Sequence, residues 1–81
     1  MANMDKSEKE EKWGQILSKV ELTSVKMLLS QQAELASFNS NKVEIAFSST
    51  WFNMIEMRRL IIENAVKKVF SEHTIVEFHI K

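Results

Sequence analysis

The stretch Trp13-Gly-Gln-Ile-Leu-Ser-Lys-Val20, followed closely by Thr23-Ser-Val-Lys-Met-Leu-Leu-Ser-Gln-Gln-Ala-Glu-Leu35, predicts two short amphipathic helices that lead directly into a strand. In the first segment, apolar side chains at positions i, i+3, i+4 and i+7 share one helical face: Trp13, Ile16, Leu17 and Val20. The second segment repeats the helical spacing at Leu22, Val25, Leu28 and Leu29, with Thr23 or Ser24 expected as its N-cap. Two apolar stripes joined this closely need a sheet to cover them.

A hairpin supplies part of that sheet. Residues 33–38 and 42–48 flank the turn Asn39-Ser-Asn41, where asparagine tolerates a positive φ. Pairing about Ser40 would place Leu35 opposite Ile45 and Ser37 opposite Val43. The second strand alternates cleanly, with Val43, Ile45 and Phe47 on one face and Lys42, Glu44 and Ala46 on the other. One face of the sheet is therefore expected to be buried and the other wetter.

The third helix is predicted over residues 50–70, with Ser48 or Ser49 as its cap. Its expected inner stripe consists of Trp51, Ile55, Ile62, Ala65, Val66 and Val69, flanked by Met54 and Ile61. By helical angle Arg58 also falls in this stripe, with its stem packed and its head reaching solvent. A last strand is predicted over residues 74–80, with Val76, Phe78 and Ile80 pointing one way.

The order of elements is helix, helix, strand, strand, helix, strand, which predicts an α+β fold with a three-stranded mixed sheet packed by helices. A right-handed crossover is expected between the second and third strands. The strand order stays open; if the first strand lay between the other two, the edge strands would be parallel. Residues 1–10 are expected to form a disordered charged lead-in or linker, joined to the first helix from about Ser7, and residues 11–81 a single interaction domain.

The amino-acid composition argues against several classes of function. Among 81 residues, 11 basic and 11 acidic side chains give a net charge of zero, whereas dedicated nucleic-acid binders carry a basic excess. There is no cysteine, so disulfides and thiolate metal sites are excluded, and a reducing, cytoplasmic location is expected. The longest apolar run, Leu60-Ile-Ile62, is too short to span a membrane, and the N-terminus lacks the apolar core of a signal peptide.

Catalytic motifs are missing from the sequence. One glycine cannot build a phosphate-binding loop, and no serine has readable histidine and aspartate partners. His73 and His79 have no obvious metal-ligand partner, so a surface or sheet-face role is expected for both. The chain is therefore predicted to be no enzyme on its own and to hold no cofactor and no metal.

Candidate contact residues lie on the third helix, because aromatic, Met and Arg side chains are enriched at interfaces. The candidates for partner binding are Phe52, Met57, Arg58, Arg59 and Leu60. Strand addition at a free edge of the sheet is a second way to bind a partner. The only plausible contributors to nucleic-acid binding are Lys42, Arg58, Arg59, Lys67 and Lys68.

The apolar pattern over residues 13–80, and above all Leu28-Leu-Ser-Gln-Gln32, resembles the C-terminal portion of the bacterial DNA polymerase III tau/gamma subunit, closest to the cyanobacterial version. This subunit is the ATPase of the clamp loader, but its ATP-binding and zinc-binding motifs are not found here. The resemblance implies a noncatalytic interaction domain that binds polymerase III or other clamp-loader subunits in DNA replication, with self-association possible.

The order of elements is also similar to the N-terminal domain of the replication initiator DnaA. That resemblance implies a KH-like fold and, as the alternative function, self-association and partner loading. The initiator's aromatic-rich second helix is replaced here by Met27-Leu-Leu29. A KH-like shape also raises weak single-stranded nucleic-acid binding as an alternative, yet the Gly-x-x-Gly loop that such binding needs is absent.

Overall fold

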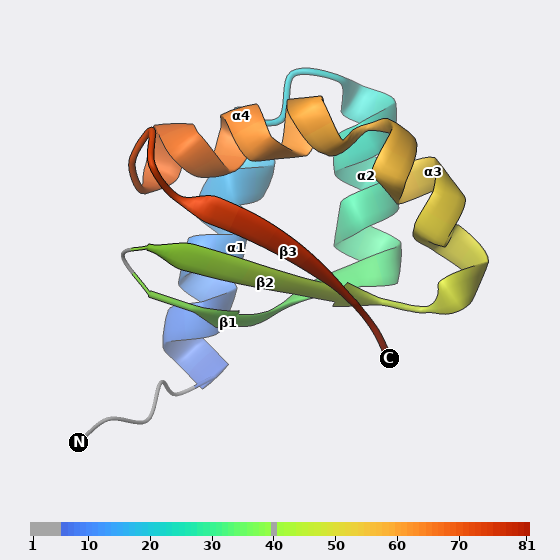
Figure 1. Cartoon of the computed structure of the whole chain (residues 1–81), viewed down its shortest axis with the longest axis horizontal. Helices are drawn as coiled ribbons and strands as arrows, with labels where there is room; N and C mark the ends of the chain where they lie inside the picture. Colours follow the sequence, from blue (N-terminus) through green and yellow to red (C-terminus); the bar gives the residue numbers. More distant parts are fainter. Residues whose placement is uncertain (1–5, 40) are drawn as a thin grey trace.

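The computed structural model describes residues 6–39 and 41–81, and it confirms the predicted α+β class, the order of elements and the three-stranded mixed sheet. Figure 1 shows the elements in chain order. They are α1 (Lys6–Lys19), α2 (Thr23–Gln32), β1 (Ala33–Phe38), β2 (Lys42–Phe47), the 3-10 turn η1 (Ser49–Trp51), α3 (Phe52–Met57), α4 (Arg59–Val69) and β3 (Ile75–Ile80).

Helix α1 begins within the charged segment that precedes Trp13. Its first residue is Lys6, so it includes residues 6–10 of the expected lead-in, while residues 1–5 lie outside the described part. Lys and Glu are good helix formers, and Glu8 stands four residues before Lys12, a favourable helical pair. Glu8 also lies in the first turn, where a negative charge suits the helix dipole.

Helix α2 begins without the expected side-chain cap. Thr23 is already the first helical residue, and the preceding Leu22 is extended and makes no side-chain cap hydrogen bond. The Leu22 carbonyl instead accepts a hydrogen bond from the Lys26 N–H at 3.0 Å. The prediction of a Thr23 or Ser24 cap was therefore wrong, because the helix starts one residue earlier than the cap requires. The predicted Ser48 or Ser49 cap of the third helical segment is wrong as well, since Ser48 makes no side-chain cap bond and Ser49 lies inside η1.

The central strand of the sheet is β2. It pairs antiparallel with β1 and parallel with β3, giving the order β1-β2-β3. The arrangement with the first strand in the middle is not adopted, and the two edge strands run antiparallel to each other. Both β1 and β3 therefore present a free edge of the sheet.

The hairpin register combines a confirmed pair and a corrected one. Leu35 lies opposite Ile45 as predicted, but Ser37 pairs with Glu44 rather than Val43. The hairpin closes by a 2.9 Å hydrogen bond from the Asn39 N–H to the Lys42 carbonyl, so the pairs near the turn shift by one residue. An irregularity between Leu35 and Ser37 absorbs the shift and returns Leu35 to the core.

Asn39 shapes this turn through its side chain. Its Oδ1 accepts hydrogen bonds from the backbone N–H groups of Asn41 at 2.7 Å and Lys42 at 2.8 Å. No residue in the described ranges 6–39 and 41–81 has a positive φ, so the expected left-handed asparagine is not found there. Ser40 lies outside the described residues.

The third helix is broken. Arg58 leaves helical geometry, with φ −107° and ψ 18°, and separates α3 from α4. The prediction of one continuous helix over residues 50–70 was wrong, and so was the placement of Arg58 in its inner stripe, because Arg58 is exposed. Ile55 on α3 and Ile62 on α4 lie on either side of this break, and both are in the core with no exposed surface.

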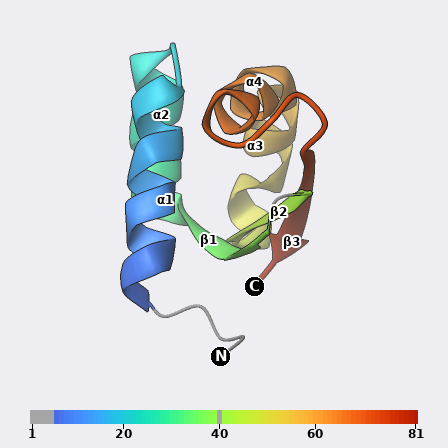
Figure 2. The same ribbon diagram turned by 90° about the vertical axis from the view of Figure 1, so that its left-hand side faces the viewer.

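All helices lie on one side of the sheet, which curves beneath them (Figure 2). The core between them is built from residues of every main element: Ile16, Val20, Val25, Leu29, Leu35, Val43, Ile45, Phe47, Ile55, Ile62, Ala65, Val66 and Val76. The other face of the sheet carries the charged side chains of β2 and β3 and faces solvent. The predicted division into a buried and a wetter face is confirmed.

Candidate protein-interaction surface

The break between α3 and α4 presents a group of exposed apolar side chains. Met57 and Leu60 are 75% and 74% exposed, and Met54 is 52% exposed. We call Met54, Met57, Arg58 and Leu60 together the α3–α4 corner; Figure 1 shows the change of direction at which they lie. Large apolar side chains exposed this close together are a common mark of a protein contact surface.

Local helix geometry explains this exposure. Met54 and Met57 are three residues apart in α3 and share a face, while Ile55 occupies the opposite, buried side. Leu60 lies in the first turn of α4, two residues before the buried Ile62. Burying Ile55 and Ile62 therefore turns Met57 and Leu60 outward.

Arg58 is the exposed cation of the corner. Among the described residues, 6–39 and 41–81, it takes part in no ion pair. An exposed arginine next to apolar side chains is well suited to bind a carboxylate on a partner.

Arg59, the neighbouring candidate, is held inside the domain. Its guanidinium donates hydrogen bonds to Glu56 at 2.8 Å, to Glu63 at 3.3 Å and to the carbonyl oxygen of Val76 at 3.1 Å. It also lies over the ring of Phe78, 4.4 Å from the centroid. The hydrogen bond to Glu56, followed by that to Glu63, raises the pKa of Arg59 above its ordinary value. Arg59 thus ties the corner to the free edge of β3.

Phe52 packs toward the core. Its ring centroid lies 6.2 Å from that of Phe47, whose side chain is fully buried. Of the five residues predicted as contacts, the structure therefore brings Met57, Arg58 and Leu60 together on the surface, and gives Phe52 and Arg59 contacts within the domain. Met54, which the sequence placed beside the inner stripe, joins the exposed group.

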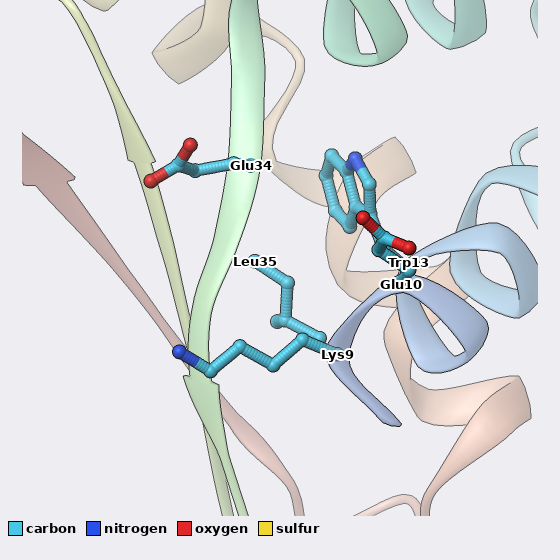
Figure 3. A pocket seen from close by; sticks show the side chains of 5 residues that line it. All are labelled: Lys9, Glu10, Trp13, Glu34 and Leu35. Carbon is cyan, nitrogen blue, oxygen red and sulfur yellow. The ribbon is translucent and has the colours of Figure 1, made fainter. Parts of the chain in front are cut away.

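A pocket of about 250 Å³ lies between α1 and β1. Lys9, Glu10 and Trp13 line it from α1, and Glu34 and Leu35 from the edge strand (Figure 3). The sequence analysis did not predict this pocket. Of its lining residues, only Trp13, an aromatic residue on the apolar stripe of the first helix, could have indicated it. The volume falls below the range of typical small-molecule sites, and its lining contains no histidine, serine, threonine or cysteine.

The comparison with protein families rests on nearly the whole chain. The model of the STICHEL, DnaA_N-like alpha-beta domain matches residues 1–80. The chain belongs to this family. Neither the curated proteins nor the solved structures gave a match. Membership supports the resemblance to the initiator's N-terminal domain; it does not confirm the resemblance to the tau/gamma subunit.

For this DnaA_N-like domain, three of the five candidates for nucleic-acid contact take part in ion pairs with acidic side chains of the same domain. Lys42 pairs with Glu44 at 3.1 Å, and Lys68 pairs with Glu21 at 3.0 Å. Arg59 pairs with Glu56 and Glu63. Of the five candidates for nucleic-acid contact, only Arg58 and Lys67 have no ion pair within the described ranges. Two separate cations give little of the electrostatic attraction on which such binding depends.

Within the described part of the chain, every helix is too short or too polar to cross a bilayer.

Proposed function

We propose that this domain is a noncatalytic protein-interaction module of the DnaA N-terminal type, acting in DNA replication in the cytoplasm without a cofactor. The observation that supports it is the α3–α4 corner, where Met57 and Leu60 are about three-quarters exposed beside Arg58. Membership in the DnaA_N-like family agrees with this reading.

The corner favours one kind of partner segment. Exposed Met and Leu side chains gain free energy when an apolar stripe covers them. Arg58 then loses its hydration, and a carboxylate on the partner compensates for that loss. We therefore propose a partner helix with an apolar face and an acidic residue beside it.

Two partner classes follow from the two resemblances. The family match favours the initiator-like role, in which the domain associates with itself and loads partners. The Leu28-Leu-Ser-Gln-Gln32 segment favours the tau/gamma role, in which the domain binds polymerase III or clamp-loader subunits. In either role the corner is the surface that binds.

Binding to purified proteins tests this proposal. The immobilised domain is exposed to DNA polymerase III subunits, clamp-loader subunits and partners of the initiator, while sedimentation measures its self-association. We expect micromolar binding to at least one of these, including a second copy of the domain. The double variant Met57→Asp/Leu60→Asp should abolish it.

The control is Met27→Asp, which introduces the same charge at another exposed methionine, on α2, that is 54% exposed against 75% for Met57. This variant should bind as well as the wild type. No binding to any of the proteins and no self-association, or equal loss in both variants, would overturn the proposal.

A further inference from the structure

The open face of the sheet brings together two carboxylates and a histidine. Glu44 on β2 lies opposite Glu77 on β3, and Ala46 lies opposite His79. Alternate residues of a strand share a face, so Glu44, Glu77 and His79 all project away from the helices, which lie on the other side (Figure 2). Glu77 is only two positions from His79, but Glu44 is 35 positions away in the chain, so the sequence alone did not bring the three ligands together.

The three side chains have the spacing of metal ligands. His79 Nε2 lies 3.5 Å from Glu44 Oε1 and 3.5 Å from Glu77 Oε1. One ligand atom from each residue lies within 4.8 Å of the other two. Ligand atoms about 2.1 Å from a tetrahedral Zn²⁺ ion are about 3.4 Å apart. Both His–Glu separations therefore already match the edge of such a site.

The ring nitrogen that faces the carboxylates is not held by a short hydrogen bond to either of them. A separation of 3.5 Å exceeds the usual 2.7–3.2 Å of an N–H···O bond. The sheet ladder also holds the backbones of β2 and β3 in register, so the positions from which the three side chains project are fixed. The ligand atoms thus need only small side-chain rotations to close around an ion.

Lys42 competes with an ion for the same carboxylates. Its Nζ lies 3.1 Å from Glu44 Oε2 and 3.6 Å from Glu77 Oε1. With neutral His79, the four side chains together carry a net charge of about −1, which still attracts a divalent cation. Because Lys42 approaches the second oxygen of Glu44, Oε1 of that residue stays available.

We propose that Glu44, Glu77 and His79 form a site for a divalent transition metal of the zinc class on the open face of the sheet. The imidazole favours zinc-like ions over Mg²⁺ and Ca²⁺, which prefer ligand sets made of oxygen alone. Three protein ligands leave a fourth position for water or for a side chain of a docked protein. This site is independent of the α3–α4 corner, and it revises the expectation that the domain holds no metal.

Isothermal titration of the metal-stripped domain with zinc chloride tests the proposal. We expect one ion per chain with a dissociation constant in the micromolar range. His79→Ala should weaken binding by about tenfold or more, because it removes the only nitrogen ligand. His73→Ala is the matched control, since His73 is exposed in the turn before β3, outside this group. It should bind zinc as the wild type does.

A second variant keeps the test independent of folding defects. Lys42→Met removes the competing cation and should tighten zinc binding about threefold or more. A damaged sheet would weaken binding instead. Absence of zinc binding at millimolar concentration, equal weakening in both histidine variants, or weaker binding by Lys42→Met would overturn the proposal.

Discussion

The two sides of the α3–α4 segment carry similar apolar side chains in opposite surroundings. Ile55 and Ile62 have no exposed surface, whereas Met57 and Leu60 are about three-quarters exposed. Hydrophobicity alone does not separate these pairs. Helical spacing does, because Ile55 and Ile62 are seven residues apart and both face the core, whereas Met57 and Leu60 lie on the opposite side of the segment.

The two neighbouring arginines repeat this contrast. Arg59 is bound to Glu56, Glu63 and the backbone of β3, while Arg58 has no ion pair among the described residues. One arginine therefore helps to hold the fold together, and the other is available to a partner. The inner side of the segment is expected to determine stability, and the outer side to determine binding.

The largest expected effect is at Ile62. Ile62→Ala removes fully buried methyl groups and should lower the free energy of unfolding by about 2–4 kcal/mol. Urea unfolding followed by circular dichroism measures it. Leu60→Ala, two positions away and exposed, should change stability by less than about 0.5 kcal/mol. Equal losses at both positions would break the comparison.

A smaller effect is expected at Arg59. Arg59→Ala removes three hydrogen bonds and the stacking on Phe78, but the side chain is partly exposed, so the loss should be about 1 kcal/mol. Arg58→Ala is the control and should stay within about 0.5 kcal/mol of the wild type. The same urea unfolding applies. A greater loss in Arg58→Ala than in Arg59→Ala would contradict the division of roles.

The smallest expected effect is on the pH dependence of stability, and it involves Glu44 on the charged face of the sheet. The hydrogen bond from Lys42, followed by that from Ser37, lowers the pKa of Glu44 below its ordinary value of 4.5. Because the pKa is lower in the folded state, this carboxylate stabilises the fold above about pH 4.5, and the contribution is lost as the pH falls through the folded value.

Comparison of the wild type with Glu44→Gln between pH 3 and 7 checks this expectation. The stability difference between them should narrow as the pH falls below about 4.5. Glu11→Gln, on the exposed surface of α1, serves as the control. A difference that widens on acidification would show that Glu44 is not stabilised by these contacts.

Much of the fold could be predicted from the sequence, because the spacing of apolar residues and the residue types preferred in turns are local signals. The alternation of Val43, Ile45 and Phe47 predicted the buried face of β2, and the asparagines predicted the hairpin. The break at Arg58 could not be predicted, since residues 50–70 contain neither proline nor glycine. Neither of the two residue types that most often interrupt a helix therefore marked the position of Arg58.

The candidate site was predictable in part for the same reason. In a helix, Met57 and Leu60 do not share the face of Ile55 and Ile62. Their exposure therefore followed from their positions in the sequence. The contacts of Arg59 with Val76, and of His79 with Glu44, join residues far apart in the chain. The first contact depends on how α4 lies against β3, and the second on the parallel register of β2 and β3, and both come only from the structure.

The central claim, that partners bind at the α3–α4 corner, is tested most directly by the methionine methyl groups. The chain has five methionines, of which Met54 and Met57 lie in the corner and Met27 lies on α2. With ¹³C-labelled methyl groups, addition of a replication protein that the domain binds, or raised concentration of the domain itself, should shift the NMR signals of Met54 and Met57. The signal of Met27 should stay in place. A shift of Met27 without a shift of Met54 and Met57 would contradict the claim.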